Sequence, residues 1–296
     1  MSEDAQRLDW VRAMPVVFVL IWSTGFIVAR YAMPHSPPMT FLWMRYALSI
    51  LAFWLWIRWA RVAWPQSRAQ WWHLGVTGVL MHAGYLGGVW TAVKAGMGSG
   101  LSALIVGFQP VLTALWLSAQ GGHVSRRQWG GLLLGFVGLV LVVSRKLQDG
   151  LEVTPWTLSM AVLALLSITT GTLYQKRYVQ PCDVRSANTV QLLAAALVTL
   201  PLVWVESEAV QWHPSLLGAM AWSVLGMTLG GSSLLYMLIQ RGAAASVSSL
   251  MYLVPPCTAI LAWFLFDEPI TLTTLMGIVL TAVGVSLVVR SPASQR

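Results

Sequence analysis

The segment from Leu80 to Trp90 reads LMHAGYLGGVW and places two polar side chains, His82 and Tyr85, among apolar and small residues. Residues three positions apart share one face of a helix, so the imidazole and the phenol would project together. A histidine titrates near neutral pH and can donate, accept or carry a proton. The pair could therefore bind a polar ligand, or it could hydrogen-bond a neighbouring helix and serve packing alone.

The composition indicates that these side chains lie in a membrane. Of the 296 residues, 57% are hydrophobic and 9% are charged, which is too little polar surface for a soluble globule. All ten carboxylates fall near the N-terminus or in short segments between apolar runs, where no ion has to enter hydrocarbon. The net charge of +8 is spread over many loops, so nucleic acid is not an expected partner. The expected partner is the lipid bilayer.

Ten segments are apolar and long enough to cross a hydrocarbon core of about 30 Å, which requires roughly 20 helical residues. The predicted spans are 14–32, 40–58, 71–93, 98–119, 127–144, 156–176, 185–205, 213–239, 244–266 and 270–289. Thirteen of the eighteen Lys and Arg residues fall in segments on the same side as the N-terminus. The positive-inside rule therefore predicts cytoplasmic termini in a multi-pass protein of the cytoplasmic (inner) membrane.

The chain contains an internal repeat, because a shift of 146 residues aligns its halves without a gap. Ser102–Val143 and Ser248–Val289 agree at eleven of 42 positions, including Pro110 with Pro256. Each copy has five spans, so the second enters the membrane from the opposite side. Inverted repeats of this kind occur in transporters whose substrate site lies near the midplane. The predicted organisation is a cytoplasmic segment 1–13, a repeat 14–144, an external linker 145–155, a repeat 156–290 and a tail 291–296.

Several motifs resemble the drug/metabolite transporter superfamily, specifically its ten-span EamA-type exporters. They are IWSTGFIVARYAMP, GLSALIVGFQPVLTALW, SVSSLMYLVPPCTAILAWFLFDEP and GIVLTAVGVSLVV. The resemblance implies an all-α membrane fold and export of small metabolites, often amino acids, through a cavity lined by spans one, three, four, six, eight and nine. The family usually has Gly-Glu before the last span of each repeat. Here the second copy has Asp267-Glu268, and the first has Gly121-Gly122-His123 without the acid.

Polar and aromatic residues recur in the spans that the resemblance assigns to the cavity. The residues predicted to bind substrate are His82, Tyr85, Trp90, Gln109, Trp22, Ser23, Thr24, Tyr174, Ser232, Tyr236, Ser248 and Tyr252. Pro110, Pro255 and Pro256 are predicted to gate the transporter, because proline kinks a helix and frees a carbonyl one turn earlier. A packing role is the alternative for each of these residues.

The cations near span ends receive a different interpretation. Arg30, Arg45 and Lys94 are expected to extend toward the outer interface, with attraction of an anionic group to the exit as the alternative. Asp267-Glu268-Pro269 has the pattern of a helix start. The cavity is therefore expected to contain neither a buried acid nor a deep arginine.

Enzyme chemistry is not expected. The two cysteines, Cys182 and Cys257, are too few for a disulfide framework or a metal cluster, and no acid lies within a span to act in catalysis. The sequence predicts no catalytic residue, no metal and no cofactor. It favours a secondary transporter that exports neutral and aromatic amino acids by alternating access. Export of other small metabolites or drugs such as nucleosides, and a passive channel, remain the alternatives. The expected partners of the protein are its small-molecule substrate and the lipid bilayer. The sequence does not determine the oligomeric state, for which a monomer is the expectation.

Overall fold

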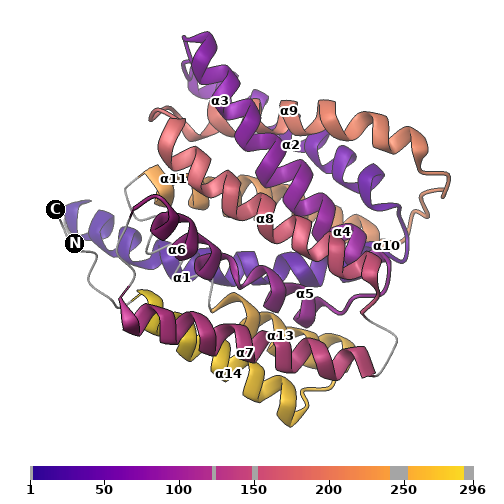
Figure 1. Cartoon of the computed structure of the whole chain (residues 1–296). Helices are drawn as coiled ribbons and strands as arrows, with labels where there is room; N and C mark the ends of the chain where they lie inside the picture. The colour runs from indigo at the N-terminus through magenta and orange to yellow at the C-terminus, as the bar shows by residue number, and fades with distance from the viewer. Residues whose placement is uncertain (1–2, 122–124, 149–152, 241–252, 290–296) are drawn as a thin grey trace.

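The computed structural model describes residues 3–121, 125–148, 153–240 and 253–289, and every regular element in them is helical (Figure 1). The elements are α1 (Glu3–Ala32), α2 (Pro38–Ala60), α3 (Arg68–Gly78), η1 (Val79–Gly84), α4 (Tyr85–Lys94), α5 (Ser99–Val106), α6 (Gln109–Ala119), α7 (Arg126–Gln148), α8 (Pro155–Tyr178), α9 (Val184–Val205), α10 (Pro214–Trp222), η2 (Ser223–Ser232), α11 (Ser233–Gln240), α13 (Val254–Phe266) and α14 (Leu272–Val289). The all-α fold predicted from the sequence is confirmed.

The helices follow the predicted spans. Within the described residues, six helical segments are long and apolar enough to cross a membrane, and they are Ala13–Ala32, Pro38–Ala60, Ser99–Trp116, Pro155–Tyr178, Val184–Val205 and Pro214–Gln240. Shorter apolar helices cover Trp129–Gly138, Val254–Phe266 and Leu272–Gly284. Large apolar side chains such as Trp59, Leu197 and Phe264 are exposed. Surfaces of this kind are rare on soluble monomers and are expected where helices face lipid.

The third and eighth spans each contain a π-helical segment at an equivalent position. Residues Val79–Gly84 of η1, shifted by 146, fall on 225–230, inside Ser223–Ser232 of η2. Short π-helical stretches within α-helices are frequent at functional sites, because they widen the helix and leave carbonyls without their usual partners. The repeat seen in the sequence is thus also a repeat of local backbone structure.

The fourth span is interrupted at Gly107, which separates α5 from α6, and the equivalent residue of the ninth span, Leu253, directly precedes α13. The break at Gly107 touches the start of α13, because a Cβ added to Gly107 would overlap the ring of Pro255. Pro110 and Pro256 lie in the first turn of the helices that follow, where a backbone N–H has no helical acceptor to lose. Pro110 therefore begins a new helix after a break and does not kink a continuous one, and Pro256 lies in the first turn of α13.

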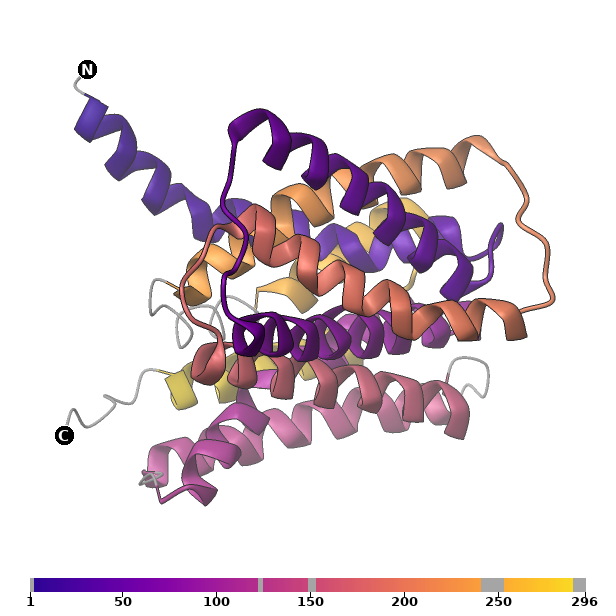
Figure 2. The same cartoon turned by 90° about the horizontal axis from the view of Figure 1, so that it is seen from above.

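Helices α7 and α14, the last of each repeat, pack against each other and lie along the bottom edge of the molecule in Figure 1; in the view from above, α14 is partly hidden by other helices (Figure 2). Glycines allow this approach. A Cβ on Gly138 would overlap the carbonyl of Gly277, and a Cβ on Gly284 would overlap the backbone of Gly131 and Gly135. Small residues let helix backbones pack closely in a membrane, where no hydrophobic force draws helices together.

Ionic contacts join the two halves on one face, which we call the Glu206 face and which holds the turns 33–37, 95–98, 206–213 and 267–271. Lys94 pairs with Glu208 at 2.6 Å. The Glu206 carboxylate accepts hydrogen bonds from the backbone N–H groups of Met39 and Thr40 at 2.8 and 2.7 Å, which caps α2. These contacts tie the end of the third span and the start of the second to the loop that follows the seventh.

A third link on the Glu206 face joins Arg30 to Glu268 at 3.0 Å. Glu268 also accepts hydrogen bonds from the backbone N–H of Ser99 at 3.2 Å and of Gly100 at 3.4 Å, at the N-terminus of α5. The prediction that Asp267-Glu268-Pro269 opens the last span is wrong. Asp267 ends α13 in a left-handed conformation, and Glu268 caps a helix of the other repeat.

The opposite face, which we call the Gln180 face, holds the turns 61–67 and 179–183. Here the amide of Gln70 donates from Nε2 to the carbonyl of Gln180 at 2.6 Å and accepts from its N–H at 3.1 Å. Asp183 caps α9, and hydrogen bonds from Arg185 hold the pKa of its carboxyl below the ordinary value. The halves are therefore in contact at both faces.

Candidate functional site

A cavity of about 30 Å³ lies between the two halves, with walls from α1, α2, η1, α4, α8, α9, η2 and α11. Its lining residues are Trp22, Gly25, Phe26, Arg45, Met81, His82, Tyr85, Leu86, Val89, Trp90, Gln175, Asn188, Gln191, Met227, Ser232, Leu235 and Tyr236. A volume of this size accommodates roughly two water molecules. Because an amino acid is several times larger, these walls must separate before a substrate of that size can bind.

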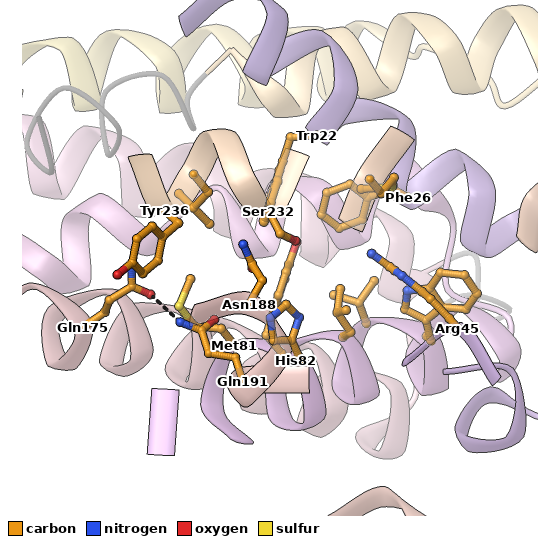
Figure 3. Close-up of a pocket in the computed structure, with 17 residues that line it drawn as sticks. Trp22, Phe26, Arg45, Met81, His82, Gln175, Asn188, Gln191, Ser232 and Tyr236 are labelled. Carbon is orange, nitrogen blue, oxygen red and sulfur yellow. Dashed lines mark hydrogen bonds between the residues drawn. The ribbon is translucent and has the colours of Figure 1, made fainter. Parts of the chain in front are cut away.

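Six residues predicted from the sequence line this cavity, and Figure 3 shows four of them by label. They are Trp22, His82, Tyr85, Trp90, Ser232 and Tyr236. His82 and Tyr85 share one face, as their spacing indicated, although the boundary between η1 and α4 falls between them. Their part in substrate binding stays a prediction.

Two other predicted residues, Ser23 and Thr24, bond within their own helix. Ser23 donates to the carbonyl of Val19 at 2.7 Å, and Thr24 donates to the carbonyl of Ile21 at 2.6 Å. Thr24 also accepts a hydrogen bond from the indole of Trp222 at 2.8 Å. In this conformation, neither hydroxyl lines the cavity.

Gln109 and Tyr174 lie outside the cavity as well. Gln109 donates from Nε2 to the hydroxyl of Thr172 at 3.2 Å and so joins α6 to α8. Tyr174 is 2.8 Å from Nδ1 of His73, and its ring lies against Tyr178. Of the remaining predicted residues, Ser248 and Tyr252 lie outside the described part of the chain.

Arg45 lines the cavity and corrects an expectation from the sequence. Its side chain is buried, with 2% of the residue exposed, and Nε donates to the hydroxyl of Thr228 at 3.0 Å. The prediction that it extends to the outer interface is therefore wrong, as is the expectation of a cavity without a deep arginine. Arg30 and Lys94 do lie at the Glu206 face, where each has an acidic partner.

Three amide side chains that the sequence analysis did not select also line the cavity. Gln191 donates from Nε2 to Oε1 of Gln175 at 3.4 Å, and Asn188 donates to the carbonyl of Val184 at 2.9 Å. A signal was present in the sequence, because residues 188, 191, 195 and 199 recur at helical spacing and are all polar or small. Their face packs inward, while Leu197 on the opposite face is exposed.

Two consecutive residues of α2 bind the two π-helical segments, one each. The hydroxyl of Tyr46 donates to the carbonyl of His82 in η1 at 2.9 Å, and Arg45 donates to Thr228 in η2. Thr228 in turn donates to the carbonyl of Ser223, five residues earlier, at 2.8 Å. Carbonyls and hydroxyls in the wide segments thereby gain partners that a regular helix would not supply.

Aromatic rings form the rest of the wall. The rings of Trp22 and Tyr85 are parallel within 2°, with centroids 6.1 Å apart, and Trp90 stacks on Phe41 at 4.5 Å. Such faces suit an apolar or aromatic group on a ligand.

Among the described residues, no cluster of His, Cys, Asp or Glu could hold a metal ion.

The cavity walls come from spans one, two, three, six, seven and eight in the described residues. This differs from the set that the resemblance implied, because α2 and α9 replace the fourth and ninth spans, of which the ninth is described only from Leu253. The reason is packing. The break at Gly107 lies against the start of α13, and no residue of α5, α6 or α13 lines the cavity.

Comparison with known proteins identifies the family. The EamA-like transporter family matches the sequence twice, over residues 13–144 and 155–290, once in each half. The chain belongs to the EamA-like transporter family. It is therefore a multi-pass membrane protein of a transporter family, in which the two repeats found in the sequence are a shared feature.

Individual relatives of this EamA-like chain are also named as transporters. The uncharacterized transporter YvbV of Bacillus subtilis is 24% identical over 288 residues, which are 94% of this chain and 91% of the relative. The uncharacterized inner membrane transporter YedA of Escherichia coli K12 is 25% identical over 248 residues, 82% of this chain and 78% of the relative. A probable amino-acid metabolite efflux pump of Salmonella typhimurium is 22% identical over 191 residues, 64% and 61% of the two chains.

A crystal structure of another protein has the same fold. It superposes with a TM-score of 0.69 at 16% identity and covers 93% of this chain and 95% of its own. At this identity the likeness describes the EamA-like fold alone.

Proposed function

We propose that this EamA-like transporter exports small metabolites, in the first place neutral amino acids including aromatic ones, from the cytoplasm. The observation that carries the proposal is the chemistry of the cavity. Its walls combine flat aromatic faces with an imidazole, three amides and hydroxyls, which suit a small polar molecule with an apolar or aromatic side chain. The Salmonella relative, named as an amino-acid metabolite efflux pump, supports the same class.

The proposed setting is the cytoplasmic (inner) membrane with both termini in the cytoplasm. The distribution of Lys and Arg supports this orientation, and the Escherichia coli relative is named as an inner membrane transporter. In this orientation the Glu206 face is external and the Gln180 face is cytoplasmic. The working unit is proposed to be a monomer, with the bilayer and the small-molecule substrate as its partners.

Alternating access is the proposed mechanism, and the contacts between the halves support it. Ionic links on the Glu206 face and the Gln70–Gln180 link on the other face each cross between the repeats. Breaking one set while the other holds would open the cavity to one side only. The cavity would gain its working volume in that step, because about 30 Å³ cannot hold an amino acid.

Transport by the purified chain in proteoliposomes tests this function. Labelled phenylalanine should move with a saturable rate that rises when unlabelled phenylalanine is present on the opposite side. His82→Ala and Tyr85→Ala should each raise the apparent KM roughly tenfold, because each loses an interaction of about 1–2 kcal/mol. Tyr31→Ala, at an exposed position on the Glu206 face, is the matched control and should behave as the parent.

The same assay separates the alternatives. Flux that rises linearly with concentration and ignores substrate on the other side would indicate a passive channel. Transport of nucleosides or cationic drugs in place of phenylalanine would keep the carrier and replace its substrate class. Parental KM values in both His82→Ala and Tyr85→Ala would show that these side chains contact a neighbouring helix and not the substrate.

A further inference from the structure

Arg45 is the one residue with a full charge among those that line the cavity. Its Nε has a partner in Thr228, but its Nη1 is buried without a hydrogen-bond partner. In the described part of the chain, no carboxylate pairs with it, and the acids there lie in turns or at the N-terminal end of α1. The guanidinium at the cavity wall thus has one buried donor without a partner and no carboxylate counter-ion among the described residues.

An unpaired guanidinium in a protein interior within a membrane is strongly unfavourable. Such groups normally pair with an acid or bind water or a ligand. Thr228 is neutral and satisfies one of the five N–H donors of the guanidinium. Arg45 lines a cavity with room for roughly two waters, so an anion that enters when the walls separate would replace water beside a charge that is already desolvated.

The cavity is polar at both ends but in different ways. Figure 3 shows Arg45 and Phe26 at one end and Gln175 and Tyr236 at the other, with His82 and Asn188 between them. Arg45 lies two turns inside the Glu206 end of α2, whereas Gln175 lies near the Gln180 end of α8. Neutral amides and a phenol can accept hydrogen bonds from an ammonium group, but they carry no opposite charge.

We propose that Arg45 binds the carboxylate of the transported molecule and that the site recognises this carboxylate rather than the ammonium group. The inference rests on the proposed function in that it takes this cavity to be the transport site. It deepens that function in one respect, the required substrate group. Carboxylic acids that lack the amino group but keep an aromatic or apolar side chain are then ligands as well, and amines without a carboxylate are not.

The expected orientation follows from the two ends. The carboxylate lies toward Arg45 and the Glu206 face, and the side chain lies against the rings of Trp22 and Tyr85. A guanidinium binds a carboxylate through two parallel hydrogen bonds, which a lysine ammonium cannot reproduce. Arg45→Lys should therefore retain part of the affinity for carboxylates. Arg45→Gln should bind carboxylates no more tightly than the corresponding uncharged compounds.

Binding to the purified parent chain, measured through ligand-induced shifts of its thermal unfolding, gives the first test. Three probes share one side chain: phenylalanine has both charged groups, 3-phenylpropionate lacks the amino group, and phenylalaninamide lacks the carboxylate. We expect the two carboxylates to bind with similar affinity and phenylalaninamide to bind about 10- to 100-fold more weakly, the range for a lost hydrogen-bonded charge.

Variants give the second test. Arg45→Gln should weaken binding of phenylalanine and 3-phenylpropionate about 10- to 100-fold and bring all three probes to similar affinity. Arg58→Gln, at an exposed position of the same helix, removes a charge from α2 without reaching the cavity and should bind as the parent does. Without ligand, Arg45→Gln should unfold at a temperature no lower than the parent, because it removes an uncompensated buried charge.

The outcomes separate this inference from the proposed function. If phenylalaninamide binds the parent as tightly as phenylalanine, the carboxylate anchor is overturned and amino-acid export stands. If 3-phenylpropionate binds and phenylalanine does not, the anchor stands and amino-acid export is contradicted. Binding of none of the three probes would overturn both. An Arg45→Gln variant that fails to fold leaves the probe series on the parent chain as the deciding measurement.

Discussion

Nε of Arg45 lies 3.0 Å from the hydroxyl oxygen of Thr228, so a residue of the first repeat is held by the π-helical segment of the second. Thr228 can accept this bond because its own proton goes to the carbonyl of Ser223 at 2.8 Å. The wide turn of η2 thereby fixes the direction of the guanidinium. In this arrangement Thr228 is a positioning residue for Arg45, with no contact to the cavity of its own.

Thr228→Val tests the positioning role. The substitution keeps the shape but removes the acceptor, so Arg45 should sample other directions and the apparent KM for phenylalanine export should rise about three- to tenfold, with little change in the maximal rate. Thr228→Ser keeps the hydroxyl and should restore the parental KM. A purely structural role would lower the yield of folded protein and leave KM unchanged, which is the result that would contradict positioning.

Gly78→Ala tests how closely α3 and α9 pack beside the cavity. A methyl group on Gly78 would overlap the backbone of Gln191, which cannot move without shifting α9. We therefore expect the free energy of unfolding to fall by about 1–3 kcal/mol. Gly218→Ala is the matched control, since a methyl group there meets nothing within 4 Å. Thermal unfolding of the two purified variants gives the comparison. Equal unfolding temperatures would show that α9 can shift away from Gly78 at little cost in stability.

Glu268→Gln tests the ionic link on the Glu206 face. The change removes the pair with Arg30 and weakens the cap of α5, so that face should open more often. A thiol reagent that cannot cross the membrane should modify Ser232→Cys in a Cys182→Ala, Cys257→Ala background about two- to fivefold faster from that side, as expected for a partly exposed pair.

Arg30→Gln is the companion variant and should have the smaller effect, because it leaves the cap of α5 in place. High salt should accelerate modification in the chain with both charges and have little effect in either variant. Equal modification rates in all three chains would mean that the Arg30–Glu268 pair does not hold this face closed.

Pro110→Ala and Pro256→Ala test the two prolines that lie in the first turns of α6 and α13. Alanine restores a backbone donor and removes the restriction on the preceding residue, so we expect the transport rate to fall more than the stability does. Pro201→Ala is the control, since Pro201 lies inside α9 and away from both positions. Parental transport rates in both test variants would assign the two prolines a packing role alone.

Cysteine labelling tests the orientation of the chain. In a background without native cysteines, Ser207→Cys on the Glu206 face should react with an impermeant reagent added outside intact cells. Gln66→Cys on the Gln180 face should react only after the membrane is opened. Both positions are exposed turn residues, so differences in burial do not explain the result. The reverse pattern would place both termini outside and reverse the proposed direction of transport.

Much of the fold follows from the sequence because a hydrocarbon core imposes length and polarity on every span. The spans, the repeat and the common face of His82 and Tyr85 needed only hydropathy, a fixed shift and helical spacing. The π-helical segments were not predicted. Their amino-acid composition does not distinguish them from the neighbouring α-helices. Gly84 of η1, for example, packs closely against Ser167 of α8, so close helix packing alone would explain a glycine at this position.

The direction of each polar side chain was decided by the tertiary structure. Arg45 lies seven residues from the start of α2, about 10 Å along the helix, a depth from which a long side chain can turn either toward the interface or into the bundle. The sequence gives this depth but not the rotation of α2. Packing of α2 against α9 and η2 sets that rotation, and it turns Arg45 and Tyr46 inward while Leu48 and Leu51 face out. The position of the single cavity charge therefore depends on the packing of α2 against helices of the other repeat, more than 120 positions away in the sequence.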